Sequence, residues 1–123
     1  MKGTVLKSTG SQYTVLSDEG QTLDCRLKGI FRLKGIKNTN PVAVGDRVTL
    51  NIEDAYTAVI TDIQERKNYI IRKSVNLSKQ THILATNIDC ALLIATLALP
   101  RTSPGFIDRY LLTAEAYHIP AVL

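Results

Sequence analysis

The stretch that decides the fold of the first half of the chain is Val44-Gly45-Asp46-Arg47-Val48-Thr49-Leu50-Asn51-Ile52. Its glycine and aspartate are typical of a tight turn, and the residues after them alternate between apolar and polar. Alternation places Val48, Leu50 and Ile52 on one face of a strand. The stretch therefore predicts a turn that leads into a half-buried β-strand.

Short alternating segments of the same kind recur on both sides of this strand. They are Thr4–Lys7, Tyr13–Leu16, Thr22–Leu27 and Tyr56–Ile63. Within Thr22–Leu27 the predicted inward face is Leu23, Cys25 and Leu27, with Asp24, Arg26 and Lys28 on the other face. Five short strands without a long helix predict a small closed barrel, which we assign to residues 1–65. An all-β OB-fold barrel is the expected architecture, and an SH3-like barrel is the competing one.

The sequence changes character near its end, where residues 82–123 predict a partial α/β segment. The continuous apolar run Cys90–Leu97 is typical of a strand that is covered on both faces. Ser103, followed directly by a proline, predicts the start of a helix. Ile119–Leu123 is again apolar and predicts another buried strand. Since one helix cannot cover both faces of such a sheet, we expect the natural protein to continue well beyond these residues.

Positive charge is concentrated in the first part of the chain. The net charge is +4, with 15 Lys and Arg against 11 Asp and Glu. Residues 1–80 carry 13 of these bases and 8 of the acids, and residues 81–123 carry 2 bases and 3 acids. Residues 66–81 are expected to be a basic linker. A basic domain favours polyanions such as RNA, and the alternative is a solvated surface.

A short cationic repeat stands out within this basic part. Arg26-Leu-Lys-Gly-Ile30 is followed by Phe31 and then by Arg32-Leu-Lys-Gly-Ile36. Cations that recur around an aromatic suit RNA, because Arg and Lys pair with phosphates and Phe stacks on bases. The residues expected to contact RNA are Arg26, Lys28, Phe31, Arg32, Lys34, Lys37 and Arg47. Alternatively, the apolar residues of the repeat cap the barrel while its cations face water, and the two interpretations are compatible.

Three tyrosines in the strand region are further candidates for base stacking. Tyr13, Tyr56 and Tyr69 each lie in or beside a predicted strand. The alternative for each is half-buried packing against the barrel, which is the commoner role of a strand tyrosine. The sequence leaves both roles open.

The cysteines and the longest apolar run indicate the class of protein. Cys25 and Cys90 lie in apolar runs, without the spacing of a metal site, and are expected to be small buried hydrophobes in a reducing cytosol. No zinc site is therefore expected within this chain. The run Ala91–Leu99 is too short to span a bilayer, so no membrane association is expected.

No motif for nucleotide chemistry is visible in the sequence. Gly29 and Gly35 are separated by five residues, not the four of a P-loop, and no GxxxxGK[ST] occurs. His82 and His118 are isolated, and no catalytic dyad is recognisable. We therefore expect no catalytic or nucleotide-binding residue in this chain.

Several segments, in this order, resemble the RsgA (YjeQ) family of GTPases that depend on the small ribosomal subunit. They are Arg32–Val48, Ile63–Arg72, Ala85–Asp89 and Phe106–Leu111. The resemblance covers essentially the whole chain. It implies an OB-fold that binds RNA, followed by the beginning of a P-loop-type GTPase domain over 82–123.

The resemblance also implies what the intact protein does. The GTPase domain of the family is circularly permuted, so the guanine-reading NKxD motif would begin just past Leu123 and a zinc domain would follow later. The intact protein would be a cytoplasmic monomer that uses GTP, Mg²⁺ and a structural zinc. It would bind small-subunit rRNA near the decoding region and hydrolyse GTP when stimulated by the subunit, in late assembly or checkpoint release. This fragment alone is expected to be inactive. The competing hypothesis is a non-enzymatic OB-fold RNA-binding module, with residues 81–123 as a dimerisation element.

Overall fold

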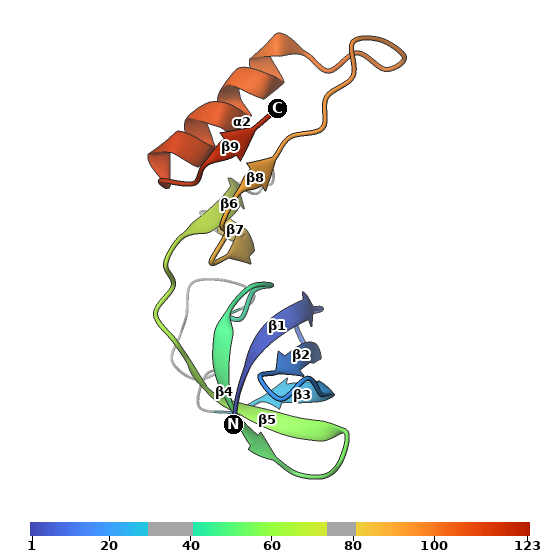
Figure 1. The fold of residues 1–123 in the computed structure, drawn as a ribbon, viewed down its shortest axis with the longest axis vertical. Coiled ribbons are helices and arrows are strands. Elements are labelled where there is room, and N and C mark those ends of the chain that lie inside the picture. Colours follow the sequence, from blue (N-terminus) through green and yellow to red (C-terminus); the bar gives the residue numbers. More distant parts are fainter. Residues whose placement is uncertain (30–40, 74–80) are drawn as a thin grey trace.

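The first part of the chain is a β-barrel in a computed structural model that describes residues 1–29, 41–73 and 81–123 (Figure 1). Its strands are β1 (Lys2–Ser8), β2 (Tyr13–Ser17), β3 (Thr22–Leu27), β4 (Arg47–Ile52) and β5 (Thr57–Ile63). They correspond to the five segments that alternation predicts. A tight turn over Asp18–Gly20 joins β2 to β3, with Gly20 at a φ of 92°.

The barrel closes in the strand order β1-β2-β3-β5-β4, with β4 pairing back onto β1. All neighbouring strands are antiparallel except β3 and β5, which run parallel with Cys25 opposite Ala58. One register shift in the β1–β2 pairing and another in the β4–β5 pairing let the strands curve round the core. This is the five-stranded Greek-key barrel of an OB-fold, which confirms the predicted architecture.

The barrel core is made by the inward face of each strand. Its buried members are Val5, Tyr13, Val15, Leu23, Cys25, Leu27, Val42, Val48, Leu50, Ala58 and Ile60. The inward faces predicted for β3 and for the start of β4 are therefore right. Ile52 is the exception, because it is 41% exposed. It is the last residue of β4, next to the turn into β5, and lies beyond the core.

A two-stranded hairpin follows the barrel, with β6 (Tyr69–Lys73) antiparallel to β7 (Thr81–Thr86). Residues 82–86 form nearly the whole of β7. The range 66–81, expected to be a linker, contains the whole of β6, because the apolar residues between its cations extend and pair with β7. The domain boundaries at 65 and 81 stay a prediction.

The last part holds β8 (Ala91–Leu92), α2 (Pro104–Ala116) and β9 (Ala121–Val122), with β9 parallel to β8. Ser103 caps α2 and a proline opens it, as predicted. The predicted strand over Cys90–Leu97 is wrong except at β8. Leu97 is 96% exposed, since no described element covers it. Cys90 is likewise exposed, against expectation.

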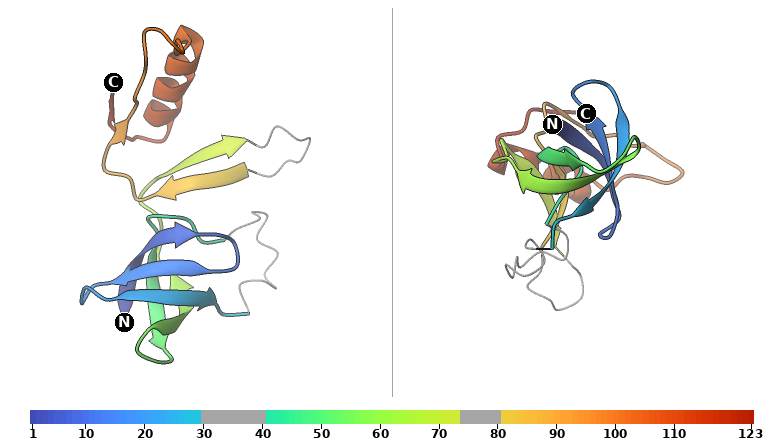
Figure 2. Two further views of the ribbon diagram at one scale, coloured as in Figure 1. Left: turned by 90° about the vertical axis from the view of Figure 1, so that its right-hand side faces the viewer. Right: turned by 90° about the horizontal axis from the view of Figure 1, so that it is seen from below.

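The three parts follow one another in space as they do in sequence. The hairpin lies between the barrel and the unit of α2, β8 and β9 in both side views (Figures 1 and 2). Across the described ranges, no helix has the length and apolar character needed to cross a bilayer.

Candidate nucleic-acid interface and its junction with the hairpin

Three of the seven residues predicted to contact RNA are described by the structure. They are Arg26, Lys28 and Arg47, whereas Phe31, Arg32, Lys34 and Lys37 lie outside the described residues. Arg26 is on the outward face of β3 and forms an ion pair with Glu53. Lys28 is exposed just after β3, and its backbone N–H donates to the carbonyl of Ile60 at 3.1 Å.

Arg47 is held by a carboxylate on the neighbouring turn. Its Nη1 and Nη2 donate to the two carboxylate oxygens of Asp18 at 2.8 Å each, and Nη1 also donates to Thr4 Oγ1 at 2.9 Å. These hydrogen bonds lower the pKa of Asp18 and raise that of Arg47. Arg47 therefore stands in a fixed orientation, and part of its charge is already balanced. The sequence did not reveal this pairing or that of Arg26.

The three candidate tyrosines have different surroundings. Tyr13 is 2% exposed within the barrel core, so packing is its role. Tyr69 packs on Tyr117, with the ring centroids 5.0 Å apart. Tyr56 is 76% exposed in the turn between β4 and β5, one of the loops that OB-folds use for nucleic acid. Its side chain is therefore available for stacking.

The turn that carries Tyr56 is fixed by Asp54. The Oδ1 atom of Asp54 accepts the backbone N–H groups of Tyr56 at 2.8 Å and Thr57 at 2.9 Å. Acceptance from the Tyr56 N–H is the main reason that the pKa of Asp54 is lowered. The turn thus holds the base of the exposed tyrosine in one backbone conformation.

A buried carboxylate joins the barrel to the hairpin. Asp46 is fully buried, and each of its two oxygens accepts two hydrogen bonds. Oδ1 accepts Arg66 Nε at 2.8 Å and Thr86 Oγ1 at 2.7 Å. Oδ2 accepts Arg66 Nη2 at 2.8 Å and the N–H of Ala43 at 2.9 Å. We call Asp46, Arg66, Thr86 and the adjoining Gly45 the Asp46 hub.

The backbones of the barrel and the hairpin also touch at this hub. The N–H of Thr86 donates to the carbonyl of Val44 at 2.8 Å, and Asn87 Nδ2 donates to that of Gly45 at 2.9 Å. Gly45 has a φ of 95°, and a Cβ there would lie 2.1 Å from the carbonyl oxygen of Thr86. A glycine is therefore required by both the conformation and the contact.

Two asparagines close the base of the hairpin. Asn68 receives the N–H of Ile88 on Oδ1 at 2.6 Å and donates from Nδ2 to the Ile88 carbonyl at 2.8 Å. Asn87 Oδ1 accepts the N–H of Lys67 at 2.8 Å. The residues that enter and leave the hairpin are thus bound to each other as well as to the barrel.

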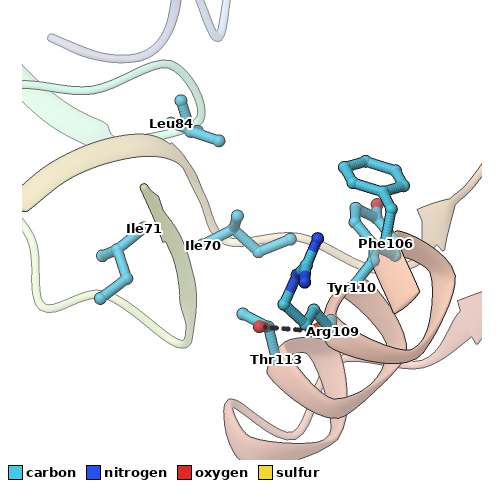
Figure 3. A pocket seen from close by; sticks show the side chains of 7 residues that line it. All are labelled: Ile70, Ile71, Leu84, Phe106, Arg109, Tyr110 and Thr113. Atoms are coloured by element: carbon cyan, nitrogen blue, oxygen red, sulfur yellow. Dashed lines mark hydrogen bonds between the residues drawn. The ribbon is translucent and has the colours of Figure 1, made fainter. Parts of the chain in front are cut away.

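A groove lies between the hairpin and α2 (Figure 3). It has a volume of 560 Å³ and is lined by Ile70, Ile71, Leu84, Phe106, Arg109, Tyr110 and Thr113. Figure 3 shows the Arg109 side chain between Ile70 and the two aromatic rings, with Thr113 donating to its carbonyl at 2.8 Å. The groove holds none of the residues predicted to bind RNA.

Nothing in the described part of the chain matches the donor set of a metal site. No group of three or more His, Cys, Asp or Glu residues gathers among residues 1–29, 41–73 and 81–123. The sequence also contains no phosphate-binding P-loop. We therefore assign none of the residues in the described ranges to GTP, Mg²⁺ or zinc.

Two family models match the chain in sequence order. The RsgA N-terminal domain matches residues 2–60, and the RsgA GTPase matches residues 63–123. The first match covers the barrel up to the middle of β5. The second contains the hairpin and the α/β unit.

Curated relatives match the whole chain. The small ribosomal subunit biogenesis GTPase RsgA of Bacteroides fragilis is 58% identical over 120 residues, which are 98% of this chain and 39% of the relative. That of Flavobacterium johnsoniae is 60% identical over an alignment of 126 residues, which covers 100% of this chain and 39% of the relative. This chain spans about two fifths of the length of these relatives.

Solved structures agree with these matches. The crystal structure of YjeQ from Thermotoga maritima has a TM-score of 0.69 at 29% identity, over 98% of this chain and 38% of that one. The crystal structure of YloQ, a circularly permuted GTPase, has a TM-score of 0.66 at 27% identity, over the same shares of the two chains. With both family models matched in order onto an OB barrel and an α/β unit, this chain belongs to the RsgA GTPase family.

Proposed function

We propose that the barrel docks the protein on RNA of the small ribosomal subunit, and that the subunit stimulates the intact protein to hydrolyse GTP during late assembly or checkpoint release. The observation that carries this proposal is a closed OB barrel in the basic part of a chain that is 58% identical to a small ribosomal subunit biogenesis GTPase. The barrel type binds oligonucleotides, and the excess of cations over residues 1–80 favours phosphates.

The proposed RNA surface is the set of residues that the sequence singled out. It comprises Arg26, Lys28, Phe31, Arg32, Lys34, Lys37 and Arg47, and we add the exposed Tyr56. We expect Lys28 and the cations within residues 31–37 to make most of the phosphate contacts. We expect Arg26 and Arg47 to contribute less to phosphate contact, because Glu53 and Asp18 already balance their charges.

The nucleotide chemistry is proposed for the intact protein and not for this chain. In that protein a circularly permuted domain would bind GTP with Mg²⁺, and a separate domain would hold a structural zinc. The protein would act in the cytoplasm as a monomer. Residues 82–123 would be the beginning of the GTPase domain, so the 123-residue chain should turn over no GTP by itself.

The test of the proposed RNA surface is a charge reversal. We expect Arg32→Glu, Lys34→Glu and Lys37→Glu together to weaken binding of this chain to small-subunit rRNA steeply. Each lost phosphate contact should also reduce the slope of log affinity against log salt concentration by about 0.7 to 0.9. The measurement is a titration of labelled rRNA at several salt concentrations.

The control variant reverses three exposed cations outside the barrel, Lys67, Arg101 and Arg109, and so changes the net charge equally. We expect it to lose far less affinity. Unchanged binding in the first variant would make residues 32–37 a solvated surface. Equal losses in the two variants would mean that only net charge matters.

A further inference from the structure

The hub links the two apolar clusters of the described chain. The first cluster is the barrel core. The second contains Ala91, Ala114 and Ile119 of the α/β unit, and Ile70 of the hairpin and Ile88 pack against it. The hairpin therefore shares a core with the α/β unit, while its attachment to the barrel runs through the hub.

The contacts at the hub fix orientation and not only proximity. The Arg66 fork meets both oxygens of Asp46, and such paired hydrogen bonds hold two planar groups at one angle. Arg66 Nη2 also donates to the carbonyl of Pro41 at 3.0 Å. Directional bonds from Ala43, Arg66 and Thr86 converge on one buried carboxylate, so sliding or rotation of the hairpin would break several bonds together.

A short covalent path continues from the hub into the second cluster. Thr86 is bound to Asp46, Asn87 is bound to Gly45, and Ile88 packs against the α/β unit. Asn68 holds the backbone of Ile88 from the opposite side of the hairpin. Three consecutive residues thus connect the barrel to the core that carries α2.

We propose that the Asp46 hub positions the barrel against the GTPase part, so that docking on the small subunit is transmitted to GTP hydrolysis. This inference rests on the proposed function. Gly45, Asp46 and Thr86 act as positioning residues, since none of them belongs to the proposed RNA surface. The hub fixes one orientation of the barrel relative to the GTPase part. When the subunit binds the barrel, the GTPase part therefore faces the subunit in that orientation.

Two glycines provide a matched pair for the test. Gly45 and Gly20 have φ values of 95° and 92°, so alanine meets the same backbone strain at both. A Cβ at Gly45 would collide with Thr86, whereas a Cβ at Gly20 has nothing within 4 Å. Any difference in activity between Gly45→Ala and Gly20→Ala therefore reports the effect of disturbing the contact between Gly45 and Thr86.

The experiment uses the full-length protein and purified small subunits. It measures subunit affinity, GTP hydrolysis without subunits and the subunit-stimulated kcat. We expect Gly45→Ala to lower the stimulated kcat by about tenfold, while affinity and unstimulated hydrolysis stay within about twofold. Gly20→Ala should match the wild type in all three. Thr86→Val, which removes the hydroxyl bound to Asp46, is the second variant if Gly45→Ala does not fold.

Either of two results would overturn the inference. One is a stimulated kcat that Gly45→Ala or, where that variant does not fold, Thr86→Val leaves at the wild-type value. The other is a parallel fall of stimulated and unstimulated hydrolysis, which marks a merely structural role. A wild-type protein that binds no small subunits, or is not stimulated by them, would instead refute the proposed function.

Discussion

Two aspartates of this chain bind an arginine fork, and their surroundings give the two pairs different roles. Asp18 and Arg47 remain 53% and 35% exposed, so water competes with their pairing. Asp46 is fully buried and the Arg66 side chain is 22% exposed. Removing one partner of a buried pair typically costs about 3–5 kcal/mol, because the other charge is left without compensation. The buried pair of Asp46 and Arg66 therefore stabilises the structure, whereas the exposed pair of Asp18 and Arg47 orients a surface cation.

The two cysteines should differ sharply in reactivity. Cys25 lies in the barrel core, where burial and then the charge of Asp24 raise the pKa of its thiol to about 11. At pH 8 its thiolate fraction is therefore about one in a thousand, while Cys90 is exposed. We expect a disulfide reagent at pH 8 to label Cys90 promptly and Cys25 only on unfolding. Two promptly reacting thiols would contradict the packing described for β3.

Single residues were predictable where a local pattern determined them. Alternation identified the buried Leu23 and Cys25, because a strand with one buried face repeats every two residues. It failed at Ile52, because the pattern does not tell where a strand leaves the core. The role of Asp46 was hidden, since its side-chain partners are 20 and 40 positions away. The Gly45-Asp46 turn was the only local signal of this site.

At the scale of elements, α2 begins at the position that its sequence predicts. Ser103 Oγ accepts the N–H of Phe106 at 3.2 Å. Ser103→Ala should destabilise the first turn of α2 by about 1 kcal/mol and speed amide exchange there roughly fivefold. Hydrogen exchange followed by NMR measures this, with the exposed Ser11→Ala as the control. Unchanged exchange at Phe106 would show that the cap contributes nothing.

The elements that sequence reasoning misjudged depend on partners elsewhere in the chain. β6 lies within the range 66–81 that the sequence predicts as a basic linker, because its cations obscure the alternation, and it forms a strand by pairing with β7. The run Cys90–Leu97 was predicted as one strand, but pairing stops at Leu92. Hydrophobicity indicates that a segment can be buried, whereas strand length is set by the neighbour with which it pairs.

At the scale of the whole molecule, a basic barrel and an α/β unit are joined by a polar hub. The barrel holds the proposed RNA surface, and the hub sets the orientation of the α/β unit relative to the barrel. Sequence reasoning predicted the two parts and their order. It gave no indication of their relative orientation, which follows from contacts between Asp46, Arg66 and Thr86.

The most direct test is directed hydroxyl-radical probing from Cys90, which is exposed on the α/β unit while Cys25 is buried. An iron chelate on Cys90 cleaves RNA that lies nearby when the chain is bound to ribosomal subunits. A barrel that docks on the small subunit and carries the α/β unit in one orientation predicts cleavage at a few discrete positions of small-subunit rRNA. That cleavage should disappear when Arg32, Lys34 and Lys37 are changed to Glu. Absent cleavage, or cleavage equally strong on large-subunit rRNA, would contradict the account.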